Sequence, residues 1–115
     1  GDRLSWVLCP RSNDYIEGAR PPIETLRRAG VRIALGTDSL SSNETLSIVE
    51  ELKMLRSVPL DEALRWATLG GAEALGIDSW AGSFVPGKRP GAVLLGGIDF
   101  RTTTLRDDTF SRRIL

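Results

Sequence analysis

Apolar and polar positions along the first third of the chain predict two strands joined by a helix. Residues 5–8 form a short apolar run typical of a buried strand, and Pro10 ends it because proline cannot continue a central ladder. Residues 11–20 are polar and irregular and predict a loop. A helix then begins at residues 21–22, two prolines whose missing N–H groups cost nothing in a first turn, and ends at Gly30, a residue suited to a C-terminal cap.

The alternation of apolar residues predicts a second strand over residues 31–35. The apolar positions that follow, from Ile48 to Leu55, recur at helical spacing and predict a helix over residues 44–56. Ser41 and Glu44 have the spacing of a capping box for this helix. Its polar face is expected to meet solvent and consists of Glu44, Glu50, Glu51, Lys53 and Arg56.

Helical spacing resumes over residues 60–69, with Pro59 at the start. The glycine pair at 70–71 is predicted to interrupt this helix, and residues 72–75 then form a short further turn. From residue 77 onwards, glycine and proline separate short apolar runs such as residues 92–95, which predicts the strands of a small sheet.

Strands that alternate with helices imply a parallel α/β architecture, so the strand at residues 31–35 is expected to run parallel to the one at residues 5–8. Two parallel strands alone leave both edges of their sheet unpaired. The two predicted strands therefore need partner strands that the sequence does not contain. We expect self-association of the chain, or pairing with a missing N-terminal part.

Composition excludes several classes of function. The 115 residues fit one ordinary domain, and fifteen basic residues balance fifteen acidic ones, so nucleic-acid binding is not expected. No apolar run approaches the roughly 20 residues of a membrane span, and residues 1–4, Gly-Asp-Arg-Leu, lack the apolar region expected of a signal peptide. The single cysteine, Cys9, excludes an internal disulfide. These features together favour a cytoplasmic protein.

The absence of histidine limits the chemistry of this chain most. Imidazole is the commonest metal ligand and the commonest general base near neutral pH. Without it the chain alone cannot build a histidine-ligated metal site, a Ser-His-Asp triad or a Cys-His pair. We therefore expect the isolated chain to bind no catalytic metal tightly and to hydrolyse nothing.

Asp38 is the strongest candidate for a functional residue. It follows the predicted strand at residues 31–35, and sites in α/β folds gather at the carboxyl ends of strands. Ser12 and Asn13 leave the same edge from the neighbouring strand and could contact a polar substrate. The alternatives are structural. Asp38 could form an Asx turn or a helix cap, and Ser12 and Asn13 could belong to a loop whose side chains hydrogen-bond to its own backbone. Cys9 lacks a histidine base and is expected to be a buried structural thiol.

Two segments together resemble a known family. Residues 8–13, Leu-Cys-Pro-Arg-Ser-Asn, and residues 36–43, Gly-Thr-Asp-Ser-Leu-Ser-Ser-Asn, look like the last two strand-loop segments of the amidohydrolase superfamily, within its deaminase and chlorohydrolase branch. Residues 60–76 resemble the helices that follow the barrel in that family. Residues 82–89 resemble the turn into its C-terminal strands. One departure is the Pro-Gly at residues 90–91, where the family usually has Ala-Asp.

The resemblance implies a fold and a chemistry. It implies the C-terminal slice of a (β/α)8 barrel, with its last two strand-helix units and post-barrel helices in residues 1–76, and strands of a small β-sandwich in residues 77–115. It implies a zinc or iron ion in the complete enzyme, with histidine ligands upstream of Gly1. Asp38 matches the aspartate that contacts this metal and relays a proton from the attacking water to the leaving group. Ser12 and Asn13 match a loop that borders the substrate.

The expected function is therefore part of a hydrolase that acts on a carbon–nitrogen bond, by deamination of a heterocyclic base or nucleoside. A second hypothesis is a stand-alone, non-catalytic structural or interaction module derived from the tail of such an enzyme. Upstream coding sequence with a His-x-His segment would distinguish the two hypotheses. The resemblance implies a small-molecule substrate for the complete enzyme.

Overall fold

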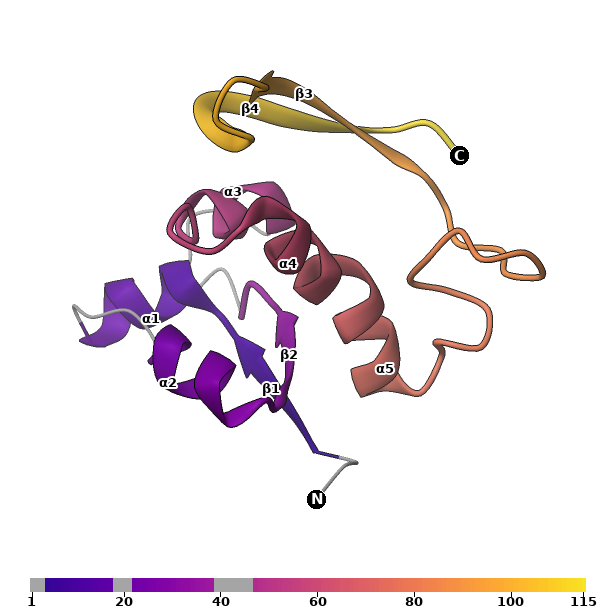
Figure 1. Ribbon diagram of the computed structural model, residues 1–115, viewed down its shortest axis with the longest axis horizontal. Coiled ribbons are helices and arrows are strands. Elements are labelled where there is room, and N and C mark those ends of the chain that lie inside the picture. The colour runs from indigo at the N-terminus through magenta and orange to yellow at the C-terminus, as the bar shows by residue number, and fades with distance from the viewer. Residues whose placement is uncertain (1–3, 18–21, 39–46) are drawn as a thin grey trace.

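The computed structural model describes residues 4–17, 22–38 and 47–115. Figure 1 shows helices α3 and α4 lying between a strand pair and a hairpin. The elements in chain order are β1 (Ser5–Leu8), α1 (Pro10–Glu17), α2 (Ile23–Ala29), β2 (Arg32–Leu35), α3 (Ile48–Lys53), α4 (Leu60–Arg65), the π-helix η1 (Trp66–Gly70), α5 (Gly71–Leu75), β3 (Val93–Asp99) and β4 (Thr104–Arg113).

Strands β1 and β2 pair in parallel, in a register that runs from Ser5 opposite Arg32 to Leu8 opposite Leu35. The predicted strands and their direction are confirmed, and so is the α/β class. A further bond follows the last pair, from the Gly36 N–H to the Leu8 carbonyl at 2.9 Å. Both strands therefore end at the same edge of the sheet, and the segments that follow them begin side by side.

The loop predicted for residues 11–20 is wrong over its described part, because Pro10–Glu17 is helix α1. Pro10 ends the strand as expected, but it also serves as the first residue of a helix, where its lack of an N–H is harmless. The helix that follows it along the chain is as predicted. It covers Ile23–Ala29 and ends at Gly30, whose left-handed φ of 66° allows its N–H to reach the Arg27 carbonyl.

Helix α3 is shorter than the pattern predicts. It begins at Ile48, after the N-cap Ser47, whose side chain accepts a hydrogen bond from the Glu50 N–H at 3.4 Å. It ends at Lys53, and a turn rather than helix continues to Arg56. The predicted capping box lies outside the described residues.

The predicted interruption at residues 70–71 is also wrong. Gly70 and Gly71 both have helical dihedral angles, with φ of −57° and −65°, and α4, η1 and α5 follow one another without a break. Gly70 has a packing role instead: a Cβ atom there would lie 2.2 Å from the Ile33 carbonyl oxygen of β2. The glycine allows the helical run to approach the strand backbone closely. The run ends at Gly76, in the left-handed conformation expected of a cap.

Strands β3 and β4 form an antiparallel hairpin with a bulge between Gly96 and Ile98. The hairpin lies on the opposite side of α3 and α4 from the strand pair (Figure 1). Leu105 of β4 is buried in the same apolar core as the strand pair and the helices. That core consists of Leu8, Leu26, Ile33, Leu35, Leu52, Leu55, Val58, Ala63, Trp66 and Leu105.

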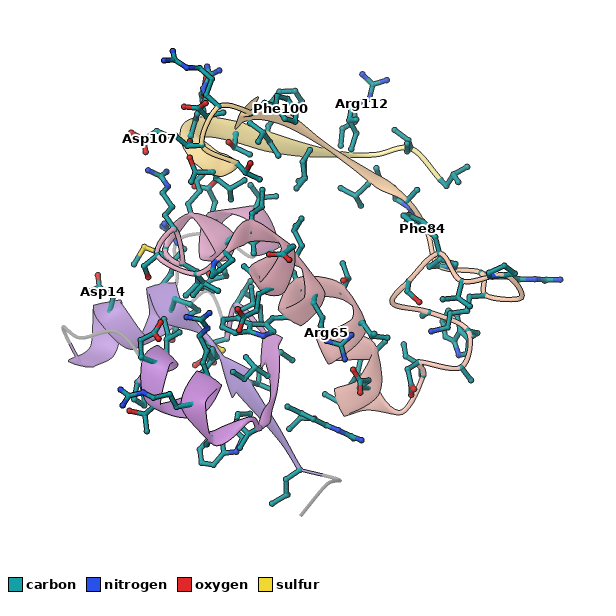
Figure 2. All side chains as sticks on the ribbon, in the orientation of Figure 1. Asp14, Arg65, Phe84, Phe100, Asp107 and Arg112 are labelled. Atoms are coloured by element: carbon teal, nitrogen blue, oxygen red, sulfur yellow. The ribbon has the colours of Figure 1, made fainter. Side chains whose placement is uncertain are left out.

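Tryptophans divide between the core and the surface. Trp66 is buried in the core, whereas Trp6 and Trp80 are 52% and 51% exposed. Phe84 and Phe100 also project outward, from the segment before the hairpin and from its turn (Figure 2). Within residues 4–17, 22–38 and 47–115, none of the helices combines the length and apolar character of a membrane span.

Arg27 joins α2 to α4 through a bidentate pair with Glu62. Its Nε and Nη2 atoms donate to the two carboxylate oxygens at 2.8 and 2.7 Å, and its Nη1 donates to Glu24 at 2.8 Å. Two parallel N–H···O bonds fix the angle between the helices more firmly than a single contact. The hydrogen bonds from Arg27 lower the pKa of Glu62 below its ordinary value of 4.5.

This pair predicts a pH-dependent contribution to stability. Because the folded pKa of Glu62 is depressed, the contribution is present above pH 4.5 and is lost as pH falls through the lower folded value. We expect Glu62→Gln to lower the thermal unfolding midpoint by a few degrees at neutral pH. The difference from the wild type should vanish in strongly acidic buffer. A difference that persists unchanged there would contradict an ionic origin.

Candidate functional site

Asp38 lies beyond the carboxyl end of β2, after Gly36 and Thr37, and is exposed. Its φ of 58° places it in the left-handed region, which is uncommon for a residue other than glycine. Aspartate tolerates this conformation better than most residues because its short side chain can bond locally. A residue held in such a conformation depends on its surroundings to keep it there.

Ser12 meets Asp38 at this edge of the sheet. Its side chain lies in the first turn of α1, is 2% exposed, and donates from Oγ to Asp38 Oδ2 at 3.1 Å. The two segments that the sequence identified, 26 residues apart, are thus joined by a hydrogen bond. Asn13 lies in the same turn of α1, and the placement of its side chain is outside what the structure describes. The contact of Asn13 with substrate stays a prediction.

Cys9 sits between β1 and α1, beside Asp38 and partly buried. A Cβ atom at Gly36 would lie 3.3 Å from the Cys9 sulfur, so the two strand ends approach closely here. Burial raises the pKa of the Cys9 thiol, and the negative charge of Asp38 raises it further. The protonated thiol is a poor nucleophile, in agreement with a packing role.

Glu51 is the residue of this region whose placement the sequence analysis missed. It was assigned to the solvent face of α3, but it is 0% exposed and its Oε1 accepts a hydrogen bond from the Arg11 N–H at 2.9 Å. A signal for this was present: Glu51 lies three residues after Ile48 and four before Leu55, which is the spacing of the apolar face. A carboxylate on an apolar face must have a buried partner.

The donor set around Asp38 does not amount to a zinc site. In the part of the chain that the structure describes, no three histidine, cysteine or acidic side chains gather in a metal-binding arrangement. The sequence has no histidine, and a zinc ion needs three or four donors. Asp38 offers one carboxylate, so we derive no chemical step through a metal from these residues.

A separate apolar cleft of about 570 Å³ lies away from Asp38. It is lined by α3, the α4–η1 helical run and the hairpin strands β3 and β4. Neither Asp38 nor Ser12 lines it, and its walls carry no acid or base. The cleft therefore belongs to the packing of the hairpin against the helices rather than to the chemistry at the strand ends.

Known proteins similar to this chain are deaminases. It is 42% identical to a 5-methylthioadenosine/S-adenosylhomocysteine deaminase from Halobacterium salinarum over 65% of the chain and 20% of that protein. It is 38% identical to the protein of the same name from Pelotomaculum thermopropionicum, over 86% of the chain and 24% of that protein. The chain thus spans about a fifth to a quarter of the length of these relatives.

Solved structures give the same result. A zinc-bound adenosine deaminase from Xanthomonas campestris matches 77% of the chain with a TM-score of 0.68 and 35% identity, over 23% of its own length. Guanine deaminase from E. coli matches 83% of the chain with a TM-score of 0.67 and 28% identity, over 24% of its length. The model of the amidohydrolase family matches residues 1–114. The chain therefore belongs to the amidohydrolase family.

Proposed function

We propose that this chain forms the aspartate-bearing corner of a metal-dependent deaminase active site. The reaction is the hydrolysis of a carbon–nitrogen bond that removes an amino group from a heterocyclic base or nucleoside. Family membership and the deaminases among its relatives support the reaction class. The single observation that carries the proposal is the 3.1 Å hydrogen bond from Ser12 to Asp38 at the shared carboxyl edge of two parallel strands.

Asp38 is proposed to move a proton during this reaction. Hydrolysis requires that water lose a proton as it attacks the ring carbon, and that the departing nitrogen gain one. An exposed carboxylate at the mouth of a parallel sheet can accept the first proton and return it to the leaving group. The Ser12 hydroxyl, held on the Oδ2 side, would fix the orientation in which the carboxylate does so.

Substrate and metal contacts complete the proposal. Ser12 and Asn13 would border a small-molecule substrate, and zinc or iron would be held by Asp38 together with histidines from outside these 115 residues. When bound, such a metal makes water easier to deprotonate. The Xanthomonas campestris adenosine deaminase, which holds zinc, supports this assignment.

The remaining parts of the proposal concern organisation. Residues 1–76 would end a (β/α)8 barrel and its following helices, and residues 77–115 would contribute strands to a small β-sandwich. Exposed apolar side chains on β1, such as Trp6 and Val7, support pairing with further strands or self-association. We propose a cytoplasmic protein with no nucleic-acid or membrane partner.

A chimera tests the proposed function. Residues 1–115 replace the matching segment of the Xanthomonas campestris adenosine deaminase, whose remaining part supplies the other ligands. We expect the purified chimera to hold zinc in stoichiometric amount and to release ammonia from adenosine. The 115-residue chain alone should do neither, because one carboxylate cannot replace three or four donors. A folded, zinc-loaded chimera without activity would contradict the proposal, as would an isolated chain that turns over substrate.

A further inference from the structure

The N-terminus of helix α1 is bonded to a side chain from another helix. Cys9 precedes α1, whose first turn contains no acidic residue. Because Pro10 has no N–H, the Arg11 N–H is the first backbone donor that needs a partner. Glu51 provides that partner at 2.9 Å, from a position on α3 that is 40 residues further along the chain. The cap of α1 is therefore a tertiary contact.

The chemistry of this contact suits a carboxylate. A helix N-terminus carries a partial positive charge, which a buried negative charge stabilises. Glu51 is 0% exposed, and a charged side chain remains buried only where such partners offset the loss of its hydration. The contact thus fixes the first turn of α1 against α3.

Ser12 follows Arg11 directly in the same turn. Two consecutive residues of α1 are therefore hydrogen-bond donors to other segments: the Arg11 N–H donates to Glu51, and the Ser12 hydroxyl donates to Asp38. Any shift of the first turn relative to α3 moves the Ser12 hydroxyl relative to Asp38. Since Ser12 is 2% exposed and packed in place, it has little freedom to compensate by changing its own rotamer.

We propose that Glu51 is a positioning residue for Asp38, which acts by holding the N-terminus of α1 and with it the Ser12 hydroxyl. This inference rests on the proposed function of Asp38. The role differs from that of Glu50, its neighbour on α3, whose carboxylate pairs with Lys53 at 2.7 Å.

A double-mutant cycle in the active chimera tests the proposal. Glu51→Gln keeps the shape of the side chain but removes its charge, and we expect it to lower kcat about tenfold with KM unchanged, as for other residues that orient a reacting group. Ser12→Ala removes the hydroxyl through which Glu51 acts. In the Ser12→Ala background, Glu51→Gln should therefore cause no further loss. Glu50→Gln, the matched control, should leave kcat and KM at wild-type values.

Two results would overturn the positioning role. One is a double variant whose loss in kcat equals the product of the losses in Glu51→Gln and Ser12→Ala, because a general loss of stability would act independently of the hydroxyl. The other is a wild-type kcat in Glu51→Gln.

A structural measurement separates this failure from failure of the proposed function. If Asp38→Asn leaves the chimera active, the proposed function is wrong, and the Arg11 amide proton resonance of the 115-residue chain still reports on Glu51. We expect it to move upfield in Glu51→Gln, and an unmoved resonance would count against the contact itself.

Discussion

Asp38→Asn should lower the kcat of the chimera by about 10²–10⁴-fold, the range that a positioned acid–base group contributes. Asparagine adopts the left-handed φ of 58° as readily as aspartate, so the backbone need not move. Its amide oxygen can still accept the hydrogen bond from Ser12. The substitution therefore removes the ability to take up and return a proton while it preserves the geometry.

Steady-state deamination and zinc analysis together check this prediction. Asp14→Asn is the matched control, since Asp14 lies on the same helix as Ser12 but is exposed, and its side chain projects outward from the helix (Figure 2). This variant should retain full activity. An Asp38→Asn chimera that keeps its zinc and loses less than about tenfold in kcat, below the range for an acid–base group, would remove Asp38 from the proton transfer. The structural alternative, a turn residue at the end of β2, would then stand.

Local patterns were sufficient to predict the elements that carry Asp38. Alternation over residues 31–35 and the apolar run at residues 5–8 identified the two strands, and their parallel pairing follows from the helix between them. Parallel strands end at one edge, which is why two segments distant in sequence could be expected to meet. The two segments do meet, through the hydrogen bond from Ser12 to Asp38.

Tertiary contacts account for what the sequence analysis missed. The polar and irregular sequence of residues 11–17 predicts a loop, but these residues lie in helix α1, whose Arg11 N–H donates to Glu51 on another helix. Glu51 was taken for a surface residue because charge was weighed before its place on the apolar face of α3. In both cases the decisive partner is 40 residues away, beyond the reach of local periodicity.

The role of the glycine pair at 70–71 also depends on a tertiary contact that the local sequence does not show. Gly70→Ala should destabilise the fold by about 1–3 kcal/mol or more, the cost of forcing extra volume into a packed region. The new Cβ atom would lie 2.2 Å from the Ile33 carbonyl oxygen, and this neighbour is backbone of β2 that cannot rotate away. The helical run or the strand would have to shift.

Gly71→Ala is expected to act in the opposite direction. Gly71 has the same helical conformation as Gly70, with φ of −65° and ψ of −41°, but a Cβ atom there would meet nothing within 4 Å. Replacement should stabilise the chain by about 0.4–1 kcal/mol, because alanine restricts the unfolded chain without strain in the folded one. Denaturant unfolding of both variants measures the two effects. If Gly70→Ala were as stable as Gly71→Ala, the glycine at 70 would serve helix flexibility rather than close approach, and the contact of η1 with β2 would be looser than 2.2 Å implies.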